Sequence, residues 1–239
     1  MTQNTGPQPD GCHTEGLTGP ARHVHQAVLA AFTRTGQPPA RSELERLARS
    51  LGASPDTVLT ELAEADAIAF HPGGEIRAAY PFSPVRTPIR VSWPGGPAAY
   101  AMCAIDALGM SAMLSHPVTI TAAEPDTGRI ITIHADGSQA RWHPRTTVVF
   151  AGSAGDACRP SAERSCGYIN FFASRRAARA WARRHPEVTG RLLTQDGALG
   201  IGIAAFGTCC RPRRDPARRQ RRPRNKYESR NGDAGGPRQ

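Results

Sequence analysis

The chain has 239 residues, enough for one substantial hydrophobic core or for a small unit joined to a medium-sized one. Its formal net charge of +10 would by itself suggest nucleic acid or an anionic surface as partner. The residues from 208 onward hold eleven Arg or Lys against three acidic side chains, an excess of +8, so residues 1–207 carry only +2. The excess charge therefore belongs to a basic tail, and the nearly neutral body of the chain gives no electrostatic reason to expect nucleic acid as its partner.

No run approaches the roughly 20 apolar residues that span a bilayer, and the N-terminal residues lack the apolar core of a signal peptide. We expect a cytoplasmic protein with no membrane partner. Its six cysteines have irregular spacings in a chain too large to need disulfides for stability, so in a reducing compartment all six are expected to be thiols.

The N-terminal third predicts a disordered arm followed by a small helical module. Residues 1–20 are polar and rich in Gly, Pro and Thr, which is typical of disorder. Residues 21–83 show the order of a winged helix, which consists of a helix at 23–35, a helix opened by a capping box of Ser42 and Glu45, a helix after Ser54, and two short strands around Pro72-Gly73-Gly74.

The third of these helices argues against DNA binding. Residues 54–65 contain Asp56, Glu61 and Glu64 and no Lys or Arg. A helix that enters the major groove normally brings cationic side chains to the phosphates. We therefore interpret the winged-helix-like module as a structural partner of the core.

Residues 84–207 predict a core of antiparallel strands and helices. After a Pro-rich connector with a strand at 89–93, we expect an apolar helix over residues 98–114, a three-stranded meander at 118–122, 130–134 and 146–150, a Gly, Ala and Ser loop at 151–165, a buried strand at 169–172, and a helix capped by Ser174. The expected fold class is α+β, with the winged-helix-like three-helix module packed on this core and with disordered termini. The second disordered terminus is the Arg- and Pro-rich tail, 208–239.

Cys103 and Asp106 form the first candidate pair for chemistry. Positions three apart on a helix share one face, so thiol and carboxylate can approach each other as nucleophile and base. The neighbours are almost all apolar, and such surroundings raise the pKa of a carboxyl group toward neutrality. The competing interpretation is a buried Cys that acts as a small hydrophobic residue beside a surface Asp.

Cys166 is the third candidate. It follows the predicted loop and precedes the strand at 169–172, a position in which a thiol is accessible and can be held in place. Its distance of 63 positions from Cys103 matches no metal-site spacing. The residues alone therefore leave open whether these two cysteines act together.

Two segments of the chain resemble the signature regions of organomercurial (alkylmercury) lyases. The first is Tyr100-Ala-Met-Cys103-Ala-Ile-Asp106, and the second runs from Cys166 through Phe171-Phe172-Ala173-Ser174 to Trp181 and Gly197-Ala198-Leu199-Gly200. The resemblance covers residues 21–207 and implies that 84–207 are the catalytic core. Relatives often have a second Cys after the position of Cys166, where this chain has Gly167.

The resemblance implies a reaction and the residues that perform it. Cys103 and Cys166 bind the organomercurial through sulfur, which suits a soft metal, and Asp106 accepts a thiol proton and returns it to carbon. The products are a hydrocarbon and Hg(II) held by the two sulfurs near Asp106. Cellular thiols or a mercuric reductase then remove the metal, as expected in mercury detoxification, and turnover needs free thiols but no cofactor.

Two alternatives stay open at the level of the sequence. One is a mercury- or metal-responsive DNA-binding regulator, and the other is a thiol protein that binds metal without catalysis. Cys158, Cys209 and Cys210 are further thiols, and vicinal Cys209-Cys210 on the tail are a candidate shuttle for Hg(II). The basic tail is also a candidate for nonspecific contact with nucleic acid.

Overall fold

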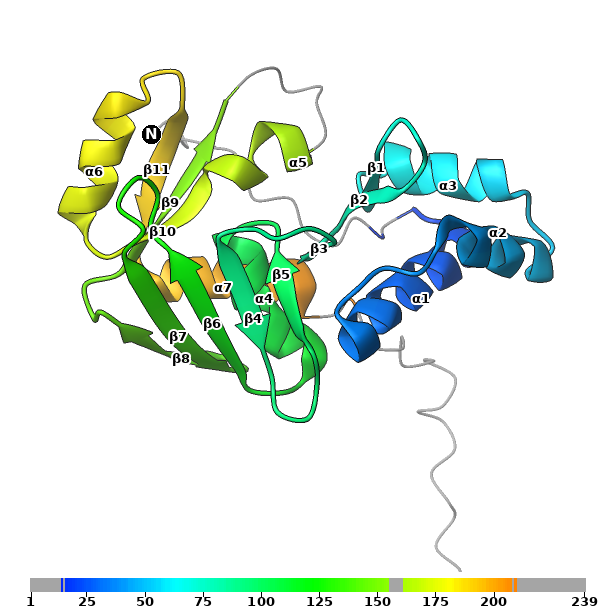
Figure 1. Ribbon diagram of the computed structural model, residues 1–239, viewed down its shortest axis with the longest axis horizontal. Helices are drawn as coiled ribbons and strands as arrows, with labels where there is room; N and C mark the ends of the chain where they lie inside the picture. The colour runs from blue at the N-terminus through cyan, green and yellow to red at the C-terminus, as the bar shows by residue number, and fades with distance from the viewer. Residues whose placement is uncertain (1–13, 15, 155–160, 208, 210–239) are drawn as a thin grey trace, which may run out of the picture.

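The structure is a computed structural model that describes residues 14, 16–154, 161–207 and 209 (Figure 1). Within these residues helices pack on antiparallel sheets, so the α+β class is confirmed. None of the described helices is long and apolar enough to cross a membrane. The predictions for residues 1–13, for Cys158 and for the tail beyond residue 209 lie outside the described residues.

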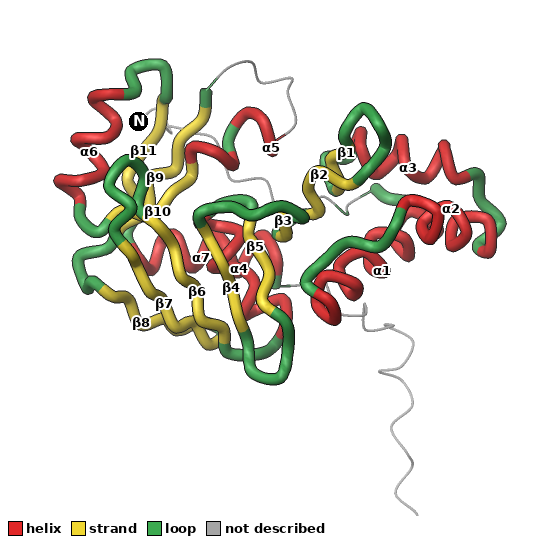
Figure 2. Tube along the Cα trace, viewed as in Figure 1, coloured by secondary structure: helices red, strands yellow, loops and turns green. Residues whose placement is uncertain are grey.

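Three helices and a hairpin form what we call the N-terminal unit. They are α1 (Gly19–Thr35), α2 (Arg41–Ser50), α3 (Pro55–Glu64), β1 (Ile68–Phe70) and β2 (Ile76–Ala79). Figure 2 shows the three helices together at one end of the molecule. Their order agrees with the predicted elements, and the winged-helix interpretation stays a prediction.

The first helix starts earlier than the apolar pattern predicts. Thr18 caps α1 by accepting a hydrogen bond from the backbone of Ala21, and Leu17 is buried. Thr18 Oγ1 also donates to Glu61 at 2.8 Å. The predicted arm therefore ends before residue 17, because these contacts attach the segment to α3.

The capping box predicted for the second helix is wrong. The N-cap of α2 is Ala40, which has no side chain that can cap. Glu45 instead lies between Arg41 at 2.9 Å and Arg49 at 3.3 Å, one helical turn away on each side. These i,i+4 ion pairs compete with the reach of a glutamate back to the helix start.

The larger sheet has eight strands in the order β1-β2-β3-β5-β4-β6-β7-β8, and all its pairings are antiparallel. The strands not yet named are β3 (Phe82–Ser83), β4 (Ile89–Ser92), β5 (Ala98–Ala101), β6 (Val118–Ala123), β7 (Ile130–Asp136) and β8 (Gln139–His143). Because β2 pairs with β3 and β3 with β5, this sheet joins the N-terminal unit to the rest. The domain boundary at 83 and 84 stays a prediction.

A second sheet holds β9 (Val148–Ser153) between β10 (Ile169–Phe172) and β11 (Thr189–Leu193). The prediction that residues 146–150 complete the meander is therefore wrong, since β8 is its third strand. Gly137, with φ 56°, lies in the tight turn that connects β7 to β8. Helix α6 (Arg175–Arg184) begins with the predicted Ser174 cap on Ala177 and packs Trp181 against Phe150 and Phe172.

Two apolar helices pack against each other and against the sheets. Helix α4 (Ala104–Leu114) packs along α7 (Gln195–Phe206) and contacts strands of both sheets. The contact is very close, because a Cβ atom on Gly109 would lie 2.5 Å from the carbonyl oxygen of Gly202. The elements predicted from the sequence include neither α7 nor the short α5 (Ser161–Arg164) and the 3-10 turn η1 (Cys166–Tyr168).

Candidate active site

Cys103 is the N-cap residue of α4, and Asp106 lies in the first turn of that helix. The predicted helical start at residue 98 is wrong, because residues 98–101 pair as β5 between β3 and β4. The thiol and carboxylate are still neighbours. Cys103 Sγ accepts a hydrogen bond from the backbone N–H of Asp106 at 3.4 Å, as a capping side chain does.

Cys166 belongs to a distant part of the sequence, the turn η1 that precedes β10, and it lies beside the start of α4. The sulfur atoms of Cys103 and Cys166 and a carboxylate oxygen of Asp106 all lie within 4.8 Å of one another. The structure therefore brings together the three residues that spacing could not join. Cys166 is only 6% exposed, so the expectation of an accessible loop thiol is wrong.

The three side chains are buried, and neither Cys103 nor Cys166 is in a disulfide. Asp106 Oδ2 has no hydrogen-bond partner in the described part of the chain. Burial, followed by the charge of Cys103, raises the pKa of Asp106 well above its ordinary value. Burial thus favours the protonated form of this carboxyl group, the form that can donate a proton.

Burial also raises the pKa of Cys103, and the hydrogen bond and charge of Cys166 add to the effect. The backbone and side chain of Asp106 act in the opposite direction but do not outweigh burial. Cys103 is consequently a thiol near neutral pH. A soft cation that binds this sulfur must displace a proton, and Asp106 is the adjacent group that exchanges one.

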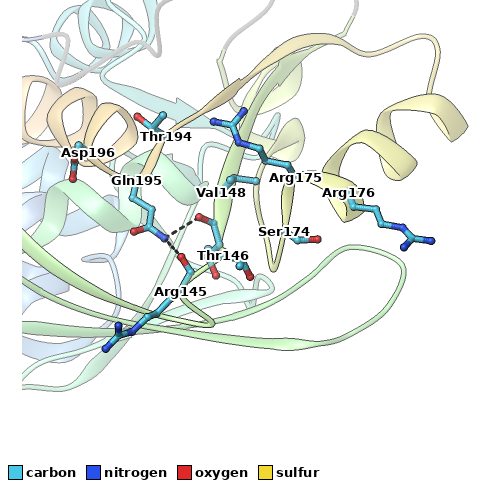
Figure 3. Close-up of a pocket in the computed structure, with 10 residues that line it drawn as sticks. Arg145, Thr146, Val148, Ser174, Arg175, Arg176, Thr194, Gln195 and Asp196 are labelled. Atoms are coloured by element: carbon cyan, nitrogen blue, oxygen red, sulfur yellow. Dashed lines mark hydrogen bonds between the residues drawn. The ribbon is translucent and has the colours of Figure 1, made fainter.

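A pocket of about 580 Å³ lies elsewhere, where β9, α6 and α7 begin (Figure 3). Arg145, Arg175, Arg176 and Asp196 line it, and Gln195 donates hydrogen bonds to the backbone carbonyls of Arg145 and Thr147. None of the three buried site residues lines this pocket. The chemistry of the thiols therefore belongs to the buried cluster alone.

Tyr80 is not among the site residues predicted from the sequence, although its side chain is buried and interacts electrostatically with Cys166 and Asp106. Burial raises the pKa of Tyr80, followed by the charges of Cys166 and Asp66, and Asp106 adds a smaller effect. No local sequence pattern around Tyr80 indicates that it lies near the site, because its location depends on how the preceding strand β2 pairs within the larger sheet.

Among the described residues, Cys209 is the remaining cysteine, and it does not belong to the cluster. Cys209 is disulfide-bonded, so the expectation of six thiols is wrong at that position, because this sulfur is bonded to another sulfur. Cys12, Cys158 and Cys210, which were also expected to be thiols, lie outside the described residues.

Comparisons with known proteins agree with the site. Alkylmercury lyases of Pseudomonas putida and Streptomyces lividans are 32% and 28% identical over 104 and 120 residues. These matches cover 43% and 46% of this chain and 48% and 55% of the relatives. The chain thus spans about half the length of the curated relatives it matches.

The fold has a solved counterpart, the mercury-bound form of MerB2, with a TM-score of 0.67 and 24% identity over 83% of this chain and 95% of that chain. At this identity the likeness concerns the fold alone. The family model of alkylmercury lyase, MerB, matches residues 82–207, which is more than half of the chain and includes all three site residues. The chain belongs to the alkylmercury lyase family.

Proposed function

We propose that this protein is an organomercurial lyase that cleaves carbon–mercury bonds by protonolysis. The observation that carries the proposal is the buried cluster in which Cys103, Asp106 and Cys166 offer two sulfurs and one carboxyl oxygen within 4.8 Å of one another. Two thiolates match a soft metal, and a protonated carboxyl group matches a carbon that needs a proton. Membership of the alkylmercury lyase family supports the same activity.

The reaction balances with the residues present. One thiol binds the organomercurial R–Hg–X through sulfur, and its proton leaves with the anion X. The second thiol then binds mercury, and its proton passes to carbon through Asp106 while the carbon–mercury bond breaks. The products are R–H and Hg(II) bound by the sulfurs of Cys103 and Cys166, so no redox change occurs and no organic cofactor is required.

The environment of Asp106 suits the proton-transfer step. An alkyl carbon is a very poor base, so the acid that protonates it must hold its proton beside the carbon. An acid shielded from solvent does so, because no water stabilises its ionised form. Burial raises the pKa of Asp106 in this way. A positioned general acid contributes about 10²- to 10⁴-fold to a rate, and coordination by two thiolates supplies a further part by weakening the bond to carbon.

Release of the product requires other thiols. Hg(II) held by two protein sulfurs leaves by ligand exchange, in which an incoming thiol replaces each sulfur in turn. We propose cellular thiols or a mercuric reductase as acceptors, and mercury detoxification in the cytoplasm as the role. The substrate is an organomercurial small molecule.

The test is a turnover assay with purified protein, an organomercurial and excess thiol, in which both the hydrocarbon and Hg(II) are measured. We expect stoichiometric formation of both products by the parent chain. Asp106→Ala should keep mercury binding and lose turnover by about 10²- to 10⁴-fold. The matched control is Asp136→Ala, since Asp136 is an exposed aspartate at the end of β7 and should retain full turnover.

Full protonolysis by Asp106→Ala would contradict the role of this residue. Mercury binding by the parent without hydrocarbon release would instead show a thiol protein that binds metal without catalysis. The regulator alternative predicts DNA binding that changes with Hg(II) in a gel-shift assay. The acidic helix α3 opposes it, and Glu61 of that helix is engaged by Thr18.

A further inference from the structure

Cys166 stands on a segment with little secondary structure of its own. The four-residue helix α5 precedes it, η1 begins at it, and β10 starts only at Ile169. Such short helical turns are not stable by themselves, because few hydrogen bonds offset the cost of ordering the backbone. The position of Cys166 Sγ therefore depends on what holds α5 on one side, as well as on the pairing of β10 with β9 on the other.

The N-terminal unit and the residue that follows it provide the first two contacts. Asp66 Oδ2 accepts a hydrogen bond from the backbone N–H of Ser161 at 3.0 Å, and Tyr80 Oη accepts one from the N–H of Ala162 at 2.7 Å. The first N–H groups of a helix have no partner within it. Asp66 and Tyr80 thus cap α5 from positions 95 and 82 residues away in the sequence.

The two capping groups are fixed to each other. Tyr80 Oη donates to Asp66 Oδ1 at 3.3 Å, and the Tyr80 side chain is buried. Because burial raises the pKa of Tyr80, the phenol keeps its proton for this bond. Arg77 adds a third contact, an ion pair with Glu163 of α5. Figure 1 shows α5 between the hairpin β1–β2 and the three-stranded sheet.

The contacts continue from α5 toward Cys166. The N–H of Ser165 donates to the carbonyl oxygen of Ser161 at 3.0 Å, and the N–H of Tyr168 donates to that of Ser165 at 2.8 Å. The N–H of Ala154, beside the end of β9, donates to the carbonyl oxygen of Arg164 at 3.0 Å. Cys166 therefore lies in a chain of backbone hydrogen bonds whose start is held by Asp66 and Tyr80.

We propose that Asp66, Tyr80 and Arg77 are positioning residues that hold α5 and thereby place Cys166 beside Cys103 and Asp106. The N-terminal unit then sets the distance between the two thiols, and this is a functional reason for the unit to be present. The inference rests on the proposed function, in which mercury bridges both sulfurs. A displacement of about 1 Å between reacting groups costs on the order of 10²-fold in rate.

The test measures Hg(II) affinity directly, with mercuric chloride as the probe and dithiothreitol as the competing chelator. We expect Asp66→Asn and Tyr80→Phe each to weaken Hg(II) binding about 10-fold or more, because a misplaced Cys166 removes the advantage of two sulfurs in one site. Turnover should fall by a similar factor. The exposed Asp56 on α3 provides the matched control, and Asp56→Asn should bind Hg(II) like the parent. A Cys103→Ser/Cys166→Ser variant gives the background from other sulfurs.

A charge-swap series keeps the test decisive if Asp66→Asn or Tyr80→Phe fails to fold. Arg77 and Glu163 are both about one-third exposed, so their exchange leaves the core intact. Arg77→Glu should weaken Hg(II) binding about 3- to 5-fold, and Arg77→Glu/Glu163→Arg should restore it. Parent-like binding by Arg77→Glu, or by the folded Asp66 and Tyr80 variants, would overturn the inference, as would a failure of the swap to restore binding.

Failure of the lyase proposal gives a different pattern. A parent chain that binds Hg(II) through both thiols but releases no hydrocarbon would refute the lyase activity, while weakened binding by the variants would still support the positioning role.

Discussion

The two thiols of the site are held in different ways. Cys103 caps α4, which packs along α7 and against strands of both sheets, so its position follows from the centre of the core. Cys166 lies on a short turn whose preceding helix is capped by side chains from a distant part of the sequence. One half of the site is thus built by packing of the core, and the other half by a few polar contacts with the N-terminal unit and Tyr80.

Among changes to the support of the two thiols, we expect the largest effect from disturbing the support of Cys103. A Cβ atom on Gly202 would lie 2.8 Å from the carbonyl oxygen of Ile105, in the first turn of α4. Backbone atoms cannot move aside singly, so Gly202→Ala should push α7 away from the helix start. We expect a loss of about 1–3 kcal/mol in the free energy of unfolding and a fall in turnover on the order of 10²-fold, measured by urea unfolding and by hydrocarbon release.

Gly200, on the same helix, is the matched control. A Cβ atom there meets nothing within 4 Å. Gly200→Ala should therefore gain about 0.5–1 kcal/mol from helix propensity and leave turnover unchanged. Equal stability of the two variants would show that the close approach of α4 and α7 does not support the site.

The next prediction compares the rates at which the two thiols react with an alkylating reagent. Under mild urea, below global unfolding, we expect iodoacetamide to label Cys166 about 10- to 100-fold faster than Cys103. Local opening of α5 breaks few contacts, and the raised pKa of Cys103 lowers its fraction of reactive thiolate. Labelling is read for each cysteine by peptide mass spectrometry.

The positioning residues sharpen this comparison. Asp66→Asn should accelerate labelling of Cys166 and leave that of Cys103 unchanged, because only α5 loses a cap. If Cys103 were labelled as fast as Cys166 in the parent, the difference in support between the two halves of the site would be refuted.

Local patterns predicted the half of the site that local structure builds. The pair of Cys103 and Asp106 was predicted from helical spacing, and the structure keeps them adjacent although Cys103 caps the helix instead of lying within it. The helices α1 to α3 and most strands of the larger sheet were predicted from hydrophobic periodicity. The α+β class followed from their order.

The missed features depend on contacts between distant parts of the chain. Residues 98–101 resemble a helix start by composition, and only pairing with β3 and β4 makes them a strand. Residues 195–206 contain three glycines, which argue against a helix until the close approach to α4 is known. Asp66 and Tyr80 carry no local signal for a role at residue 161, and the site's third member was joined to the others only by resemblance to a family.

The smallest effect concerns the N-terminal unit and its dependence on pH. His25 on α1 is 1% exposed, and neither ring nitrogen has a hydrogen-bond partner among the described residues. Burial lowers its pKa from 6.5 to about 4. The unfolded chain therefore binds a proton at a higher pH than the folded chain, and the contribution of His25 to stability is constant above pH 6.5 and falls as the pH decreases toward 4.

From pH 7 to pH 5 the titration of His25 should lower the free energy of unfolding by about 2 kcal/mol. Urea unfolding of the parent and of His25→Leu at both pH values isolates the contribution, since other titrating groups cancel in the difference. The parent should lose stability relative to His25→Leu as the pH falls, whereas His23→Gln, an exposed position on the same helix, should follow the parent.

If the N-terminal unit positions Cys166, lowering the pH to 5 should also increase the ratio of the labelling rate of Cys166 to that of Cys103. This increase should be larger in the parent than in His25→Leu. A parallel pH response of parent and His25→Leu would show that the buried imidazole does not link acidity to the second thiol.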